Sequence, residues 1–204
     1  MKKLSTRDFV LLALLVAILI VLGYVNIPQP AGLSITFNMI PVAIAAIAVG
    51  AKGGAIIGGA FGLISFLQCF GIMGSSGLGI ALMQEGASPI LMFIHRFGSR
   101  LLDGWLLGWI FRLFRDRLRA GMPVSCAVTG FMAAFLNTLL FMTSLVWLFG
   151  NTEYMRNSMA GRGMLTYIVA AVGVNGVVEM IVSTLLSAAV GLALVKAGFI
   201  QNEK

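Results

Sequence analysis

The sequence contains few charged residues and very few acidic ones. Asp, Glu, Lys and Arg make up only 10% of its 204 residues and seven residues are acidic, whereas 59% are hydrophobic. A soluble domain of this size needs a charged and polar surface, which so few charged side chains cannot supply. The composition therefore largely excludes soluble enzymes and predicts a membrane protein. The excess of Lys and Arg then indicates orientation in a membrane, not nucleic-acid binding.

The sequence is also poor in residues that bind metals or form disulfides. Its two cysteines, Cys69 and Cys126, lie in apolar segments without C-x-x-C spacing, which predicts buried packing thiols. His95 is the single histidine. It has no H-x-x-x-H partner, so we predict a hydrogen-bonding role on a helix and no metal or other cofactor. No G-x-x-x-x-G-K-[ST] motif occurs, so any ATP hydrolysis must come from a partner.

Apolar segments predict an all-α polytopic membrane protein, a six-transmembrane-helix bundle forming a single domain over residues 1–204. The expected spans are residues 8–25, 36–50, 53–70, 89–114, 123–149 and 164–196. The first imitates a secretory signal, but no small-x-small cleavage pattern follows it, so we expect it to be retained. The second is short for a membrane and should be sheltered by its neighbours. Residues 71–88 and 150–163 are expected to be loops.

Lys and Arg are distributed unevenly between the two ends of these spans. Only Arg156 and Arg162 fall in one set of connecting segments. Ten fall in the other set: Lys2, Lys3, Arg7, Lys52, Arg112, Arg115, Arg117, Arg119, Lys196 and Lys204. The positive-inside rule then places both termini in the cytoplasm and the loops at 26–35, 71–88 and 150–163 outside. We interpret the arginine run at 112–119 as a topology determinant beside anionic lipid head groups, in preference to a partner site.

Small residues recur every four positions in two of the expected spans. Ala13 and Ala17 form A-x-x-x-A, and Gly54, Gly58 and Gly62 follow one another in steps of four. Such spacing leaves a smooth helix face on which another backbone can pack closely. For the glycines we predict packing within the chain, whereas the alanine pattern is weak by itself.

Four ionisable residues lie inside the expected spans: Arg96, Arg100, Asp103 and Glu179. A charge in a bilayer costs several kcal/mol unless it is paired or hydrated, so such residues mark a functional site or an internal ion pair. Arg96, Arg100 and Asp103 share one helix face. The helical rise places Arg100, Asp103 and Glu179 in one layer, together with Asn137 and Asn175.

Two interpretations of this polar layer remain open. The structural one is a pair between Arg100 and either Asp103 or Glu179. The functional one is an outward-opening pocket with substrate-binding residues Arg96, Arg100, Asn137, Asn175 and Glu179. For a ligand with a carboxylate, Arg96 is the expected partner because it is nearer the mouth, with Arg100 held by Asp103 or Glu179. The two asparagines can both donate to and accept from the neutral groups of the ligand.

Several stretches resemble a known family. Together with Ala13 and Ala17, the runs T-F-N-M-I-P-V-A at 36–43 and G-A-K-G-G-A-I-I-G-G-A-F-G-L-I-S-F at 50–66 resemble substrate-binding (S) components of energy-coupling factor (ECF) transporters. The resemblance covers essentially the whole chain. Within the family, G-L-I-S-F-L-Q-C-F at 62–70 and N-G-V-V-E at 175–179 look most like the pantothenate branch.

The resemblance implies a non-enzymatic vitamin-binding subunit in the cell membrane. It implies docking on a transmembrane T component with two ATP-binding-cassette ATPases, with Ala13 and Ala17 packed on the T component. It also implies that the loops at 26–35 and 71–88 cover the vitamin and that the subunit topples in the membrane during transport. Riboflavin, folate and pyrimidine branches remain alternatives. A self-sufficient secondary transporter is disfavoured because no internal repeat is found, and an intramembrane enzyme because no nucleophile and base pair is found.

Overall fold

The computed structural model describes residues 4–24, 27–28 and 34–200, and for residues 27, 28, 34, 35, 174 and 175 the description covers the backbone alone. Its α-helices are α1 (Thr6–Tyr24), α2 (Met39–Val49), α3 (Ala51–Leu67), α4 (Gly77–Gln84), α5 (Pro89–Phe93), α6 (Ser99–Arg112), α7 (Met122–Phe149), α8 (Glu153–Met159) and α9 (Met164–Lys196). Shorter turns are the 3₁₀ helix η2 (Gln68–Phe70) and the π-helices η3 (Ile94–Gly98) and η4 (Leu113–Arg117). Two-residue strands β1 (Ile27–Pro28) and β2 (Ser34–Ile35) pair antiparallel. Apart from this pair, the regular structure of the described chain is helical, as the composition predicts.

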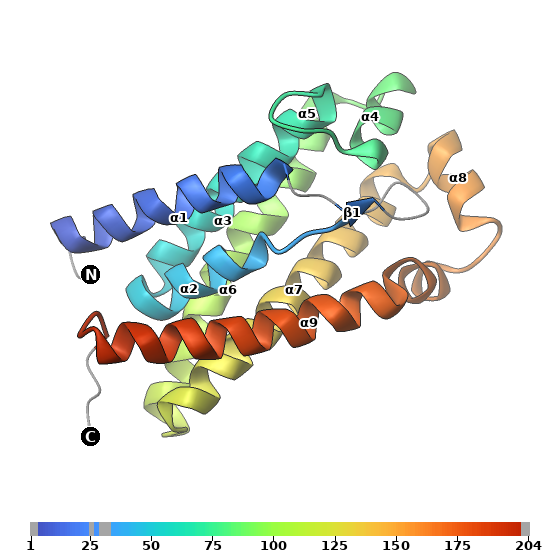
Figure 1. Ribbon diagram of the computed structural model, residues 1–204. Helices are drawn as coiled ribbons and strands as arrows, with labels where there is room; N and C mark the ends of the chain where they lie inside the picture. Colours follow the sequence, from blue (N-terminus) through green and yellow to red (C-terminus); the bar gives the residue numbers. More distant parts are fainter. Residues whose placement is uncertain (1–3, 25–26, 29–33, 201–204) are drawn as a thin grey trace.

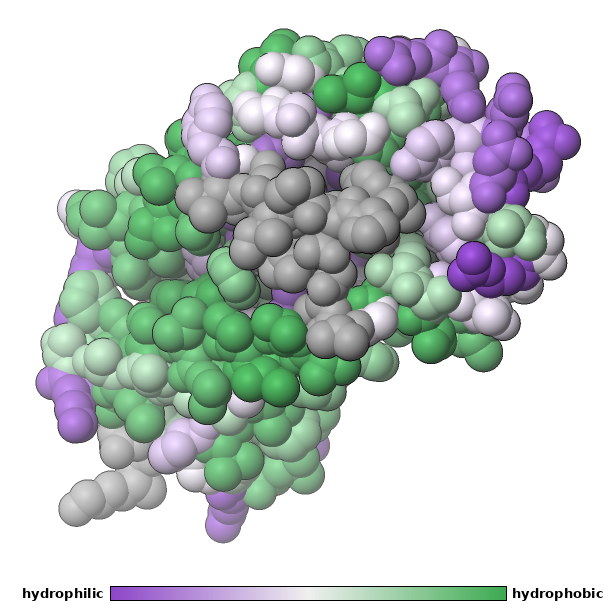
Figure 2. Space-filling model, turned by 45° about the vertical axis from the view of Figure 1, so that its right-hand side comes forward, coloured by the Kyte–Doolittle hydropathy of each residue, from purple (hydrophilic) through white to green (hydrophobic). Residues whose placement is uncertain are grey.

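Four of the described helical segments are long and apolar enough to cross a membrane. They are Thr6–Tyr24, Ala51–Phe70, Met122–Phe149 and Gly176–Lys196. The fourth expected span, 89–114, corresponds to the successive helical turns α5, η3, α6 and η4, in which two π-helical segments alternate with α-helix. Figure 2 shows a largely hydrophobic flank, with hydrophilic residues gathered toward the ends of the molecule.

The two ends of the bundle differ in what they contain. One end gathers the start of α1, the α2–α3 turn, the α6–α7 turn and the end of α9 (Figure 1). Arg7 donates to the carbonyl of Gly198 at 3.0 Å, which ties the first helix to the last at this basic end. The opposite end carries α4, α8 and the β1–β2 pair (Figure 1). The basic segments predicted to share one side of the membrane therefore do lie together.

The short helix α2 lies at the centre of the bundle. It packs against α1, α3, α6, α7 and α9. Most of its side chains are buried, including Val42, Ala43, Ala45 and Ala46, which are fully inaccessible. This confirms that the neighbours shelter a segment too short to cross a bilayer by itself. The helix begins at Met39, after the first three residues of the expected span.

The glycine series on α3 brings two helix backbones into contact. A Cβ on Gly54 would overlap the carbonyl oxygen of Gly104, and one on Gly58 would overlap that of Arg100. A Cβ on Gly62 would lie 2.7 Å from the Cα of Phe97. The prediction of close packing within the chain is confirmed. This approach sets the part of the chain carrying Arg96 and Arg100 directly against α3.

The expectation of a continuous loop at 71–88 is wrong, because α4 forms inside it. Ser76 is the N-cap of this helix, and its Oγ accepts a hydrogen bond from the Gly79 amide at 3.3 Å. Leu78 and Leu82, one helical turn apart, are both buried. The high glycine content obscures a short apolar helix whose apolar positions and N-cap are both present in the sequence.

The expected polar loop at 150–163 likewise contains a helix, α8. Thr152 caps it by accepting from the Met155 amide at 3.4 Å, and the Met155 side chain is fully buried. The amide of Tyr154 also donates to Glu85 Oε2 at 3.1 Å. The two short helices of this end are thus linked to each other.

The expected sixth span is not one uninterrupted helix. Gly173 has a non-helical backbone (φ 41°, ψ −136°), which breaks α9 into a shorter first part and a long second part. Glycine tolerates positive φ without a Cβ clash, so the break falls where the sequence permits it. The first part packs with α4, α7 and α8 in a buried apolar cluster that includes Leu78, Met155 and Tyr167.

Candidate functional site

Arg96 lies at a meeting point of four elements. Its side chain is only 4% exposed. Its Nη1 donates to Ser65 Oγ of α3 at 3.2 Å, and its Nη2 donates to Ser76 Oγ at the start of α4 at 3.1 Å. The guanidinium carbon is 5.0 Å from the centroid of the Phe141 ring on α7. Two hydroxyls and an aromatic face therefore fix this cation inside the bundle.

The guanidinium of Arg96 keeps donors that the protein does not use. Of the five N–H groups of an arginine, the two hydrogen bonds above occupy two, and Nε is buried with no partner among the described residues. A carboxylate is a suitable acceptor for such an unpaired N–H of a buried cation. A Cβ on Gly79 would be 3.0 Å from Nη2, so α4 lies directly against this cation.

Arg100 follows one helical turn after Arg96 and is also buried. Its Nη1 donates to the Arg96 carbonyl oxygen at 3.2 Å, and its guanidinium carbon lies 4.5 Å and 4.6 Å from the ring centroids of Phe61 and Phe141. Cation–π contacts of this kind partly replace the solvation that a buried guanidinium loses. Both arginines thus converge on the Phe141 ring.

The expected hydrogen-bonded pairing of Arg100 with Asp103 or Glu179 is not found. Asp103 is fully buried, and neither of its oxygens has a hydrogen-bond partner among the described residues. Glu179 Oε1 instead accepts from the Thr36 amide at 2.8 Å. The reason is geometric, because the Arg100 side chain turns toward α3 and α7. Glu179 anchors the segment that follows β2.

The structure describes the side chain of only one of the two predicted asparagines. Asn137 Oδ1 is buried and without a partner in the described part of the chain, so its acceptor is available inside the bundle. Asn175 belongs to α9, but its side chain lies outside the described residues. Of the five predicted substrate-binding residues, the structure brings Arg96 and Arg100 together, and it ties Glu179 to a different segment.

His95 makes the hydrogen bond that the sequence predicts. Its Nδ1 lies 2.8 Å from Ser144 Oγ, and that hydroxyl donates to the Leu140 carbonyl at 2.7 Å. Nε2 of the same ring is buried without a partner among the described residues. The ring centroid lies 4.5 Å from that of Phe141.

Sequence reasoning misses several residues of this cluster, chiefly Ser65, Ser76 and Phe141. Isolated serines and phenylalanines are frequent in apolar helices and give no signal by themselves. The glycines around Ser75 and Ser76 favour a flexible loop in the sequence. The N-cap preference of serine ahead of Leu78 and Leu82 could have identified Ser76.

The alanine pattern of α1 lies on the surface of the bundle. Leu12, Leu15 and Leu19 are buried, whereas Ala13 and Ala17 are exposed on another face. Large apolar residues around them are also exposed: Phe9, Val10, Leu14, Ile18 and Val21. The small residues therefore do not serve packing within the described chain.

The fold and the buried cationic cluster define a polytopic helical membrane protein with polar groups enclosed between its helices. A family model described as "ECF transporter, substrate-specific component" matches residues 7–191. The chain therefore belongs to the substrate-specific (S) component family of ECF transporters. Proteins of this family are transporter subunits, not enzymes.

Two curated relatives match over nearly their full length. A protein of Lactococcus lactis subsp. cremoris named pantothenic acid transporter PanT is 30% identical over 207 residues, covering 97% of this chain and 98% of the relative. A protein of Leuconostoc mesenteroides subsp. mesenteroides named pantothenate transporter PanT is 31% identical over 195 residues, covering 93% of this chain and 90% of the relative.

Proposed function

We propose that this chain is the membrane-embedded subunit that binds pantothenate for an ECF-type importer. The observation that carries the proposal is the buried Arg96 guanidinium, whose Nε–H has no partner among the described residues. Pantothenate has one carboxylate, which can accept from this N–H, and the two curated relatives are named as transporters of this vitamin. A desolvated arginine facing an unpaired carboxylate is a strong, oriented contact.

In the proposed complex Arg96 holds the carboxylate of the vitamin. Ser65 and Ser76 orient the guanidinium, and Arg100 supplies a second positive charge. Asn137 and Asn175 bond the hydroxyl and amide groups of the ligand, since an amide side chain donates and accepts at once. Glu179 takes part by holding the segment at Thr36. The helix α4 covers the site from the end that opens outward.

We also propose the arrangement in the membrane and the partners. Six spans cross the bilayer as a single domain, and the basic end with both termini faces the cytoplasm of the bacterial cell, as the positive-inside rule requires. The exposed faces of Ala13 and Ala17 receive helices of a T component that works with two ATPase subunits. The absence of an ATP-binding motif in the sequence agrees with energy supplied by partners.

Calorimetry on the purified, detergent-solubilised chain tests the ligand assignment. Pantothenate should bind, and riboflavin, folate and a pyrimidine vitamin precursor should not. If riboflavin, folate or the pyrimidine precursor binds and pantothenate does not, the chain belongs to another vitamin branch of the family. Proteoliposomes test the partnership: the chain alone should not accumulate pantothenate, and adding the T component, the ATPases and ATP should start uptake. Accumulation by the chain alone would contradict the S-component mechanism.

A further inference from the structure

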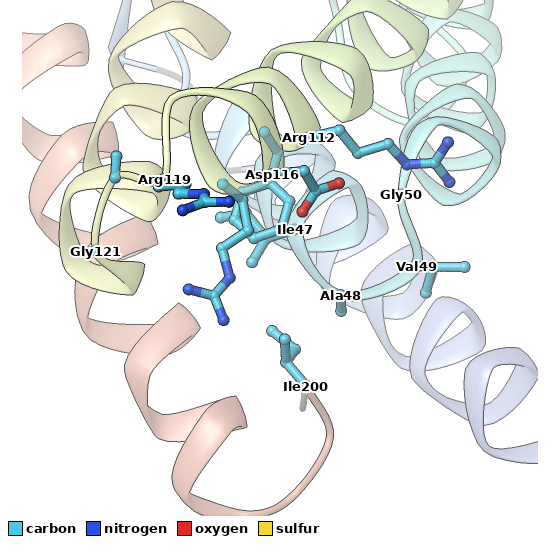
Figure 3. Close-up of a pocket in the computed structure, with 12 residues that line it drawn as sticks. Ile47, Ala48, Val49, Gly50, Arg112, Asp116, Arg119, Gly121 and Ile200 are labelled. Carbon is cyan, nitrogen blue, oxygen red and sulfur yellow. The ribbon is translucent and has the colours of Figure 1, made fainter. Parts of the chain in front are cut away.

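A cavity lies at the basic end of the bundle, apart from the arginines of the proposed vitamin site. It has a volume of about 870 Å³ and is lined by the end of α2, the end of α6 with η4, the turn before α7 and the residue Ile200 that follows α9. Figure 3 shows Asp116 and Arg119 around this space with Ile47 and Ile200, while the Arg112 side chain extends toward Gly50. None of the residues proposed to bind the vitamin lines it.

The charged lining of the cavity is strongly positive. Arg112, Arg115 and Arg119 line it together with a single acid, Asp116. Arg112, Arg115 and Asp116 belong to the end of α6 and to η4, whereas Arg119 lies in the turn that follows η4. Arg117 belongs to the same basic run but is not part of the lining. Three guanidiniums against one carboxylate leave a net positive charge at the mouth, which favours an anion with several oxygens.

The helix ends around the cavity carry partial charges of both signs. Gly50 and Gly121 are the N-caps of α3 and α7, whose first-turn amides are partly positive, whereas α2 and α6 with η4 end here with partly negative carbonyl groups. The positive charge of the cavity therefore comes from the arginine side chains. Arg112 lies against Gly50, because a Cβ there would be 3.3 Å from its Nη2. Arg119 has a left-handed backbone (φ 50°), a conformation in which glycine is usual. The backbone conformation at this position is therefore less favourable for arginine than it would be for glycine.

The other walls of the cavity are apolar. Ile47, Phe111 and Ile200 line it beside the arginines. The exposed ring of Trp109 lies one turn before Arg112, whose guanidinium carbon is 5.6 Å from the ring centroid. Exposed tryptophans next to basic residues are typical of the head-group level of a bilayer. The cavity thus combines cationic side chains with an apolar wall.

We propose that this cavity binds the phosphate head group of an anionic phospholipid. Arg115 and Arg119 contact the phosphate, and Arg112 adds positive charge beside Gly50. Ile47, Phe111 and Ile200 contact the glycerol and the first acyl carbons. Basic pockets between membrane helices are known to take such head groups. We assign the occupant as a lipid and not as free phosphate, because the apolar side chains can make favourable contacts with acyl carbons but not with an inorganic ion. The proposal depends on insertion in a membrane but not on the identity of the vitamin.

Lipid-dependent thermal stability of the purified full-length chain tests the proposal. Delipidated protein in detergent is titrated with phosphatidylglycerol, with phosphatidylcholine, or with inorganic phosphate, and the unfolding midpoint is followed. Phosphatidylglycerol should raise the midpoint at low concentration, and the other two should not. Arg119→Gly should weaken the phosphatidylglycerol effect about fivefold while relieving the left-handed backbone, so that folding is not impaired. Arg117→Gln is the matched control and should respond as wild type does.

Each alternative outcome is decisive. Equal protection by phosphatidylcholine, or equal weakening by Arg117→Gln and Arg119→Gly, would overturn the proposal, because general charge and not the cavity would then be responsible. Equal protection by inorganic phosphate would overturn the assignment to a lipid. Pantothenate binding by Arg119→Gly, measured in parallel, should match wild type. If neither the wild type nor any variant binds pantothenate, the proposed function is refuted. The effect of phosphatidylglycerol on the unfolding midpoint would still test the lipid site.

Discussion

The buried guanidinium of Arg96 donates a 3.1 Å hydrogen bond to Ser76 Oγ, and the same hydroxyl accepts from the amide of Gly79 to cap α4. One oxygen therefore joins the cation of the proposed vitamin site to the helix that lies over it. In the proposed complex, Ser76 therefore connects a carboxylate bound to Arg96 with the start of α4.

Replacing Ser76 with Ala should destabilise the protein. The change removes an N-cap and a hydrogen bond from a buried cation, which together should lower the free energy of unfolding by about 1 to 3 kcal/mol. The exposed neighbour Ser75 is the matched control, and Ser75→Ala should have little effect. Thermal unfolding in detergent measures both. Equal stability of the two variants would show that the capping contact is unimportant.

Much of the helical fold could be predicted because apolar segments of sufficient length have one stable arrangement in a bilayer. The sheltered position of α2 followed from its length, and close packing of Gly54 within the chain followed from small residues at a spacing of four, although its partner Gly104 was not identified. Two short helices were missed, because their signals are a single N-cap and two apolar residues each. The break at Gly173 was also missed, since an isolated glycine inside an apolar helix is usually tolerated.

Alanine at Gly54 or Gly58 should destabilise the bundle severely. A methyl group at either position would overlap a carbonyl oxygen of α6, so the two helices must separate, at a cost of about 1 to 3 kcal/mol or more. Gly98 is a helical glycine whose added methyl group would have no atom of a neighbouring element within 4 Å, and Gly98→Ala should be neutral or slightly stabilising. Folded yield and unfolding temperature distinguish them. Similar loss for Gly98→Ala would contradict the packing argument.

Tryptophan at Ala13 or Ala17 should abolish assembly with the T component while pantothenate affinity stays near wild type. Both alanines are exposed, so the ring has room in the isolated chain but blocks close approach of another helix. Ala13→Ser and Ala17→Ser keep a small side chain and should assemble. Co-purification reports assembly, and calorimetry reports the vitamin. Equal loss of vitamin binding in the tryptophan variants would place the two alanines inside the folded core.

Glu179 offers a test of its assigned contact. Glu179→Gln keeps an oxygen that can accept from the Thr36 amide, so stability and pantothenate affinity should stay within about threefold of wild type. Glu179→Ala removes the acceptor and should weaken binding by about tenfold, since a buried amide loses its partner. Calorimetry on the two variants measures this. Equal damage from both would indicate that the negative charge, and therefore an ion pair, is what matters.

The candidate site was only partly predictable. The sequence identifies Arg96 and Arg100 because cations are costly in a membrane segment, whatever surrounds them. It cannot show which way their side chains turn, so the contacts of Arg100 with Phe61 and Phe141 were not foreseen. Ser76 was missed because its partner lies on another element. Charged residues in apolar segments can be identified from the sequence because burying them costs free energy. The hydroxyl groups and aromatic rings that contact them cannot be identified in this way.

The most direct test of the account is whether Arg96 recognises a carboxylate. Calorimetry should compare pantothenate with pantothenol, in which an alcohol replaces the carboxylate, on wild type, Arg96→Ala and Arg100→Ala. Wild type should prefer pantothenate, and Arg96→Ala should bind it about 30-fold to several thousand-fold more weakly and lose that preference. Arg100→Ala should mainly lower folded yield and keep the preference. If Arg96→Ala still prefers pantothenate as wild type does, the carboxylate lies elsewhere and the central claim is wrong.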